Sequence, residues 1–122
     1  MQPHCRRAVA FIAASLQSAD SSPLLVDLTA NEVFSFAGEL SARRVVITNN
    51  RDGTYFTGAD ECGMLSLYDH DAERFFTFQQ DRGRFWGFDY GSRTYYSGQV
   101  QDRLVRIEDE ECAGVFSYAL GG

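Results

Sequence analysis

The sequence has no lysine, and all eleven of its basic residues are arginines. Without a lysine amino group the protein cannot form a lysine Schiff base with a carbonyl substrate, so that enzyme chemistry is excluded. The arginines are scattered along the chain, and the formal net charge is −6. Because negative charge repels phosphate backbones, the sequence predicts an acidic protein that binds no nucleic acid.

Long apolar runs are also missing from the chain. A membrane-spanning helix needs roughly 20 consecutive apolar residues, so we expect no membrane segment. The 122 residues are 44% hydrophobic and 14% aromatic, which is enough to build a hydrophobic core. We therefore expect one soluble domain covering residues 1–122.

Cysteine is scarce, and Cys5, Cys62 and Cys112 fit no zinc or redox spacing. An odd number of cysteines argues against a disulfide framework, so the sequence predicts free thiols and a cytoplasmic location. His4-Cys5 is a weak candidate for a metal site. The chain has no Gly-rich phosphate loop, Cys-x-x-Cys pair, metalloprotease helix or nucleophile elbow. We therefore expect no cofactor and no metal, and enzyme activity is the minority hypothesis.

Apolar residues near the start of the chain recur at helical spacing: Cys5, Val9, Ile12 and Leu16. The segment Asp20-Ser21-Ser22-Pro23 breaks this pattern, so we predict one amphipathic helix over residues 4–18. The pair Arg6-Arg7 before an apolar stretch resembles a short secretory signal. Gln17-Ser18-Ala19 has a bulky residue where cleavage requires a small one, which favours a helix of the mature protein.

A repeat dominates the rest of the chain. Thr54-Tyr55-Phe56-Thr57-Gly58 returns forty residues later as Thr94-Tyr95-Tyr96-Ser97-Gly98. The shorter period of the repeat is twenty residues, because aromatic residues recur at that spacing at Phe36, Phe56, Phe76, Tyr96 and Phe116. A second ladder with the same spacing comprises Asn49, Asp69, Asp89 and Asp109. The pattern is typical of a 20-residue β-hairpin repeated in tandem along the chain, and it predicts about nine strands over residues 33–119.

These features predict a mainly β fold, an antiparallel up-and-down meander that closes into a small barrel. We expect the N-terminal helix to lie over one end of the barrel or against its wall. Loops of about four residues would pair Ile47 with Phe56, Phe56 with Leu65, Leu67 with Phe76, and Phe76 with Phe85. Residues 24–32 have no clear pattern. The alternative is a pair of propeller blades, which would require an oligomer.

Carboxylates gather at the barrel end formed by loops 49–53, 69–73, 89–93 and 109–113, which we call the acidic end. The candidate residues there are Asp69, His70, Asp71, Asp89 and Asp109. They could bind calcium or a cationic ligand, or act as an acid/base pair with His70. The favoured interpretation is that each Asp caps a tight turn, and we expect Asp69 to face Arg74 across the strands.

An aromatic band is expected on the outer face, where a barrel should be polar. The same pairing places Tyr68 opposite Phe75, Phe75 opposite Trp86, and Phe88 opposite Tyr95. Large exposed apolar patches usually mark interfaces. Three hypotheses explain the band: the helix covers it with Val9, Ile12 and Leu16; a second protomer covers it; or it binds a foreign partner or ligand.

Taken together, the sequence favours a non-enzymatic β domain. Its leading function is to bind a small apolar or amphipathic ligand in the barrel, or to associate through the aromatic band. The first alternative is a protein-interaction or homo-oligomerisation module with a filled barrel. The second is a small hydrolase-like enzyme that uses His70 and the carboxylates of the acidic end.

Overall fold

A computed structural model describes residues 1–18 and 22–121. These residues form one helix and ten strands, so the mainly β class is confirmed. The elements are α1 (Pro3–Gln17), β1 (Leu24–Asp27), β2 (Glu32–Leu40), β3 (Arg44–Asn49), β4 (Tyr55–Glu61), β5 (Met64–Asp69), β6 (Arg74–Asp81), β7 (Arg84–Asp89), β8 (Thr94–Gln101), β9 (Leu104–Asp109) and β10 (Gly114–Leu120).

The ten strands form a closed antiparallel barrel in which each strand pairs with the next in sequence. The barrel closes at β1, where Leu25 is paired with Phe34 of β2 on one side and Leu120 of β10 on the other. The predicted number of nine strands was one too low, because β1 lies in the segment 24–32 that had no clear pattern. A four-residue strand is too short to display a convincing alternation. Closure also excludes the propeller alternative.

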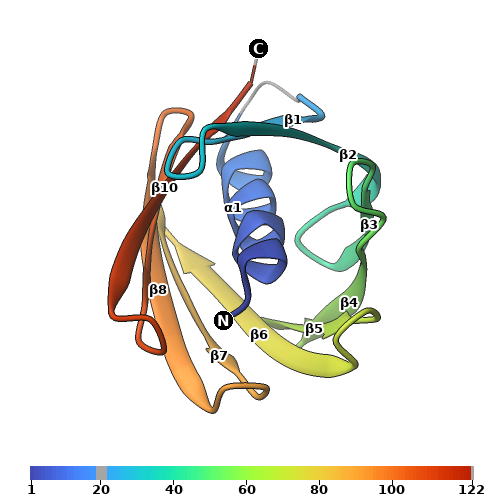
Figure 1. Cartoon of the computed structure of the whole chain (residues 1–122). Helices are drawn as coiled ribbons and strands as arrows, with labels where there is room; N and C mark the ends of the chain where they lie inside the picture. The colour runs from blue at the N-terminus through green and yellow to red at the C-terminus, as the bar shows by residue number, and fades with distance from the viewer. Residues whose placement is uncertain (19–21, 122) are drawn as a thin grey trace.

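Helix α1 lies inside the barrel, with the strands arranged around it (Figure 1). This corrects the expectation that the helix lies over one end of the barrel or against its wall. Every residue from Ala8 to Ala14 is buried, so no face of this part of the helix is left for solvent. The helix contacts β1, β2, β8, β9 and β10.

The composition of α1 explains why it fits there. Four of the enclosed residues are alanines, at positions 8, 10, 13 and 14. A helix with ordinary side chains is about 10–12 Å across. The interior of a barrel of about eight strands is just wide enough to be filled by side chains, so ten strands leave room for a slim helix. Pro3 suits the first helical turn, because its missing N–H has no intrahelical partner there.

The aromatic ladder of the repeat faces the helix. Phe11 of α1 stacks on Phe36 with ring centroids 4.4 Å apart. On the inner face Tyr96 of β8 passes over β7, and its Oη donates a hydrogen bond of 2.5 Å to the carbonyl oxygen of Thr77 on β6. Burial raises the pKa of Tyr96 well above 10.0. Gly87 makes this bond possible, since a Cβ there would lie 1.9 Å from that oxygen and 2.5 Å from Tyr96 Oη.

The strand register was predicted correctly at the acidic end and incorrectly at the other. Ile47 pairs with Phe56 and Leu67 with Phe76, as the four-residue loops of the acidic end require. Phe56, however, pairs with Asp69, and Phe76 with Asp89. The pairings Phe56–Leu65 and Phe76–Phe85 were therefore wrong, because they assumed four-residue loops at both ends.

The far end uses two-residue turns instead. Cys62 and Gly63 have φ values of 56° and 86°, and Arg82 and Gly83 have values of 51° and 79°. Positive φ at both central residues is the mark of the tight hairpin turn whose twist matches that of the strands. Strands that meet at these turns are longer than expected, which moves each residue to a different partner.

Candidate functional site

The acidic end is built from side chains that point into the barrel where strands end. Asp69, Asp89 and Asp109 of the ladder are buried, and so are Asn49 and Asp27 of β1. In each of them Oδ1 accepts a hydrogen bond from a backbone N–H two or three residues further on, at distances between 2.9 and 3.1 Å. This is the turn-capping geometry that Asp and Asn favour at hairpin ends.

The second carboxylate oxygen of each aspartate faces a cation of the N-terminal segment. The nearest approaches are Asp27 Oδ2 to Arg7 Nε at 3.0 Å, Asp69 Oδ2 to His4 Nε2 at 2.5 Å, Asp89 Oδ2 to the Met1 amino nitrogen at 3.6 Å, and Asp109 Oδ2 to Arg6 Nη1 at 3.1 Å. Asn49, the one neutral member of the ladder, donates instead to Asp52. The ladder therefore caps the turns with one oxygen and holds α1 with the other.

Asp109 is the centre of this network. Its carboxylate is 1% exposed and lies 3.1 Å from both the Met1 amino nitrogen and Arg6 Nη1. Arg6 also donates to the Met1 carbonyl oxygen at 2.6 Å, and its guanidinium lies 3.7 Å from the centre of the Phe116 ring. Burial lowers the pKa of the Met1 amino group, but hydrogen bonds to Asp109 and Glu111 outweigh burial and raise it above 8.0.

The network leaves Asp69, Asp89 and Asp109 of the acidic end occupied by the chain's own cations. Asp69 faces Arg74 in the strand pairing, as expected, but its closest charged partner is His4. Among the described residues no group of three or more His, Cys, Asp or Glu side chains could hold a metal ion. What the arrangement does chemically is fasten the helix inside the barrel.

The His4–Asp69 pair sets a pH dependence. The hydrogen bond to Asp69 raises the pKa of His4 above 6.5. Burial raises the pKa of Asp69, but hydrogen bonds from His4, Ala72 and Asp71 outweigh burial and hold it below 3.8. The pair therefore stabilises the fold fully between about pH 4 and pH 6.5. This contribution is lost as the pH rises through the folded pKa of His4 or falls through that of Asp69.

We predict that His4→Gln removes the part of this pH dependence that arises above pH 6.5. The native protein should lose about 1 kcal/mol more free energy of unfolding than His4→Gln between pH 6 and pH 9, because only the native protein loses a charge-assisted hydrogen bond. Urea denaturation at the two pH values measures the difference, and His70→Gln is the control on the outer surface. Equal losses in the native protein and His4→Gln would contradict the prediction.

His70 lies on the other side of the wall from Asp69, and Asp71 lies in the turn that follows β5. The Nε2 atom of His70 is 2.8 Å from Thr57 Oγ1, and its ring lies between those of Tyr55 and Tyr68. Asp71 Oδ2 accepts a 2.8 Å hydrogen bond from the backbone N–H of Tyr55. Consecutive strand residues point to opposite faces, so the structure does not bring His70 and Asp69 together as an acid/base pair.

The second candidate region is an outer aromatic wall, formed by Tyr68, Phe75, Trp86, Phe88, Tyr90 and Tyr95 on β5 to β8 and the turn after β7. Phe75, Tyr90 and Tyr95 are 54%, 58% and 62% exposed, and Trp86 is 40% exposed. Val9 and Ile12, which were expected as a cover, are buried inside the barrel. The hypothesis that α1 covers the band is therefore wrong.

Ring contacts divide the wall into two clusters. Tyr68 lies 4.6 Å from Phe75, and Phe88 lies 4.9 Å from Tyr90 and 4.8 Å from Tyr95, all between ring centroids. The expected pairs Tyr68–Phe75 and Phe88–Tyr95 are confirmed by the strand pairing.

The expected pairing of Phe75 with Trp86 was wrong. Trp86 pairs with Gln79 on β6 and with Ser97 on β8, because the turn at Arg82-Gly83 has two residues instead of four. Trp86 Nε1 donates a 3.1 Å hydrogen bond to Gln79 Oε1, which draws the indole toward β6.

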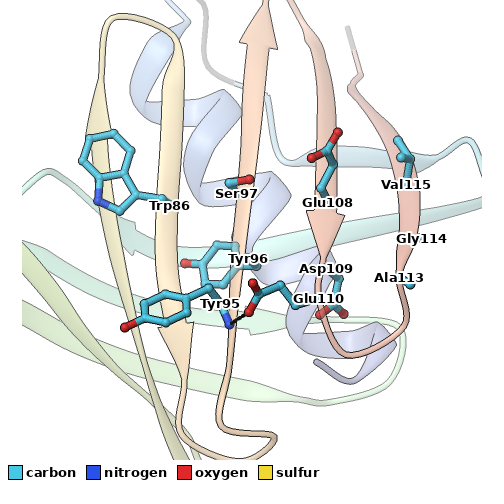
Figure 2. Close-up of a pocket in the computed structure, with 10 residues that line it drawn as sticks. All are labelled: Trp86, Tyr95, Tyr96, Ser97, Glu108, Asp109, Glu110, Ala113, Gly114 and Val115. Carbon is cyan, nitrogen blue, oxygen red and sulfur yellow. Dashed lines mark hydrogen bonds between the residues drawn. The ribbon is translucent and has the colours of Figure 1, made fainter.

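This position of Trp86 opens a groove on its other side (Figure 2). Across the wall the strand pairing aligns Trp86, Ser97, Glu108 and Val115 in one row. Ser97 is the small residue of the row and lies on the groove floor, while Trp86 borders one side and Glu108 and Val115 line the other (Figure 2). The groove encloses about 450 Å³, and we call it the Trp86 groove; its lining includes Trp86, Tyr95, Ser97, Glu108, Glu110 and Val115.

This groove was not predicted from the sequence. Trp86 and Tyr95 were predicted as members of the aromatic band, but Ser97, Glu108 and Val115 were given no role there. The strand pairing contained the information needed to predict the groove. Because Phe88 pairs with Tyr95 in antiparallel strands, the residues two positions further along, Trp86 and Ser97, also lie opposite each other. A large side chain opposite a small one on a solvent face predicts a depression.

Fold and site together define a class of protein: a closed antiparallel barrel filled by its own N-terminal helix, with an aromatic groove on the outer wall. No family model, no curated protein and no solved structure matches the chain. Within the described part of the chain, no helix is long and apolar enough to cross a membrane. Any function must therefore be argued from the geometry of the site itself.

Proposed function

We propose that the protein is a non-enzymatic interaction module that binds its partner through the Trp86 groove. The observation that carries the proposal is the gathering of exposed aromatic side chains around a groove on a wall that α1 leaves open. Aromatic residues dominate the energetics of protein interfaces, and contiguous apolar surface on a soluble domain commonly marks a binding site.

Because α1 fills the interior of the barrel, a binding site on the outer wall is favoured over one inside the barrel. A ligand carried inside the barrel would need the space in which Ala8 to Ala14 are enclosed. The ring of Phe36, on which such a ligand could stack, is already stacked on Phe11. The small apolar or amphipathic group that the sequence predicts as a ligand therefore fits better in the outer groove.

The dimensions of the groove favour an aromatic side chain. Trp86 and Glu108 lie on strands two spacings apart, which is roughly 9.5 Å. A flat ring held between two walls needs roughly 7–8 Å, since each contact is about 3.5–4.0 Å. Glu108 and Glu110 add carboxylates that attract the positive edge of an aromatic ring, an indole N–H or a cation.

The enzyme alternative receives less support from the same geometry. His70 and Asp69 lie on opposite sides of the wall, and Asp69, Asp89 and Asp109 face cations of the N-terminal segment. An acid/base mechanism needs its groups within hydrogen-bond reach of one reacting atom. Binding, rather than catalysis, is the function that the arranged side chains fit.

Indole and p-cresol, which mimic the side chains of Trp and Tyr, test the groove without a known partner. We predict that titrating either compound shifts the NMR signals of the Trp86 indole N–H and of the Ser97 and Glu108 amides. Trp86→Ala should weaken binding by about tenfold, because one ring wall is lost. Since Trp86 is the single tryptophan, its fluorescence gives a second readout.

Tyr55→Ala is the matched control, because Tyr55 is an aromatic residue of the outer surface at 36% exposure and does not line the groove. It should leave binding of both compounds unchanged. Shifts confined to interior residues such as Phe36 and Ile107 would instead favour a carrier with an exchangeable helix. Absence of any shift at millimolar concentrations would contradict the proposed site.

A further inference from the structure

We infer that the Trp86 groove binds an extended peptide segment in which an aromatic residue has a basic residue two positions away on one side and an acidic residue two positions away on the other. The inference rests on the proposed function, since it names the class of partner that occupies that groove. Its basis is the pattern of side chains on the outer face of β7, β8 and β9.

A second groove, of about 330 Å³, lengthens the site along β8. The two grooves share Trp86, Ser97 and Glu108 in their linings, so they join into one track. Because β8 lies between β7 and β9, its outward side chains form the floor of the track. Three rows of side chains cross it: Phe88, Tyr95 and Glu110 nearest the acidic end; Trp86, Ser97 and Glu108 in the middle; and Arg84, Gln99 and Arg106 at the far end.

The spacing of the rows matches that of an extended chain. Consecutive rows are two residues apart on each strand, which is about 6.8 Å. An extended peptide that lies along β8 repeats its wall-facing side chains at this same interval, at positions i, i+2 and i+4. A ring held beside Trp86 therefore places the two flanking side chains next to Glu110 and Arg106. An α-helix, about 10–12 Å across, is wider than the roughly 9.5 Å between β7 and β9.

The two ends of the track carry exposed charges of opposite sign. Among the described residues, none forms an ion pair with Arg84, Arg106 or Glu108. Glu110 Oε1 accepts a 2.7 Å hydrogen bond from the Tyr95 N–H, which holds this carboxylate next to Tyr95. A basic side chain at this end meets a carboxylate and an aromatic ring, whereas an acidic side chain at the far end meets two guanidinium groups.

Partners of a single charge fit this track less well. A basic peptide would be attracted by the carboxylates of Glu108 and Glu110 but repelled by the guanidinium groups at the far end, and an acidic peptide would meet the reverse problem. A small zwitterion would not reach from one end to the other, because Glu110 and Arg106 are four residues apart on β9, which is about 13.6 Å. Five extended residues span both charged rows.

Three pentapeptides, blocked at both ends, test the inference. The first, Arg-Thr-Tyr-Thr-Glu, has the inferred pattern, and its threonines favour an extended chain. In the second, Thr-Arg-Tyr-Glu-Thr, the same residues are reordered so that the charges lie next to the tyrosine and point to the opposite face. The third, Arg-Thr-Tyr-Thr-Arg, has a second positive charge in place of the acid.

We expect the first peptide to bind the native chain at least about tenfold more tightly than the other two. The fluorescence of Trp86 reports binding, because the peptides contain no tryptophan and the protein contains one. Shifts in the NMR signals of the Ser97 and Gln99 amides locate each peptide on the floor of the track.

Arg106→Glu should reverse the preference for charge at the far end. The variant should bind Arg-Thr-Tyr-Thr-Glu about tenfold more weakly than the native chain does, and Arg-Thr-Tyr-Thr-Arg more tightly. Its binding of indole, which is uncharged, should not change. Arg44→Glu on β3 is the matched control, because it makes the same change of charge at a side chain that is 69% exposed on another wall. It should bind all three peptides as the native chain does.

Equal binding of the first two peptides would overturn the inference, because the spacing of the charges would then not matter. Tightest binding of Arg-Thr-Tyr-Thr-Arg to the native chain would overturn it as well, since the net charge of −6 would explain the attraction. An Arg106→Glu variant with native preferences would count equally against it. If indole binds and no peptide does, the inference fails while the proposed function stands. A chain that binds neither would contradict both.

Discussion

Asp109→Asn is expected to lower the free energy of unfolding by about 3 kcal/mol, which is typical of breaking a buried ion pair by removing one partner. The substitution preserves shape and keeps an oxygen that can accept the turn hydrogen bond from Glu111. It removes the negative charge that faces Arg6 and the Met1 amino group in the interior. Urea denaturation followed by far-ultraviolet circular dichroism measures the loss.

Asp81→Asn is the control for this prediction, since it makes the same chemical change at a side chain that is 72% exposed. Surface substitutions of this kind usually change the free energy of unfolding by less than about 0.5 kcal/mol. If Asp109→Asn were as mild as Asp81→Asn, the carboxylate would not be holding α1 in place. The acidic end would then be a set of turn caps alone.

Phe11→Ala is expected to cost about 3–5 kcal/mol of free energy of unfolding, as large-to-small substitutions of aromatic residues in cores do. Phe11 is 7% exposed and stacks on Phe36 inside the barrel. The cost should lie toward the upper end of this range, because closed strands around a rigid helix cannot collapse into the cavity. Thermal and urea denaturation both measure the effect.

The control is Phe75→Ala, which deletes the same ring from the outer wall, where Phe75 is 54% exposed. It should cost less than about 1 kcal/mol, since little buried surface is lost. Similar losses for the two variants would show that α1 is not enclosed by the strands. A large loss for Phe11→Ala alone would establish the helix as the core of the barrel in solution.

The two expected results concern one arrangement, in which the barrel is completed by its own helix. The apolar side chains of α1 fill the interior, and its cations meet the carboxylates at the acidic end. This leaves the outer wall as the surface on which exposed aromatic side chains remain. An interior used for folding and an exterior used for binding are thereby separated on opposite faces of the same strands.

Much of the barrel could be predicted because alternation is a local property. The twenty-residue spacing from Phe36 to Phe116 identified one hairpin repeated, and alternation showed which residues face inward. Four-residue loops were assumed at both ends and were correct at the acidic end, where Asp69 and its equivalents cap the turns. The two-residue turns at Cys62-Gly63 and Arg82-Gly83 were missed, because positive φ at a non-glycine residue is not signalled by its identity.

The candidate site was less predictable. Trp86 and Tyr95 were recognised as unusual on a solvent face, but the groove between them and Glu108 depends on how three strands align. The role of Asp109 was also hidden. The position of Asp109 in the twenty-residue ladder indicated only that it caps a turn. Its Oδ2 atom accepts a hydrogen bond from Arg6, which is more than one hundred residues away in the sequence.

The sequence by itself determined the class of the fold, the period of the hairpins and the inward and outward faces of the strands. Each of these depends on neighbours within about twenty residues, where spacing and residue type carry the information. Only the tertiary structure decided that β1 closes the barrel and that α1 fills it. Those outcomes depend on the volume that ten strands enclose and on charges that meet across it, which no local pattern contains.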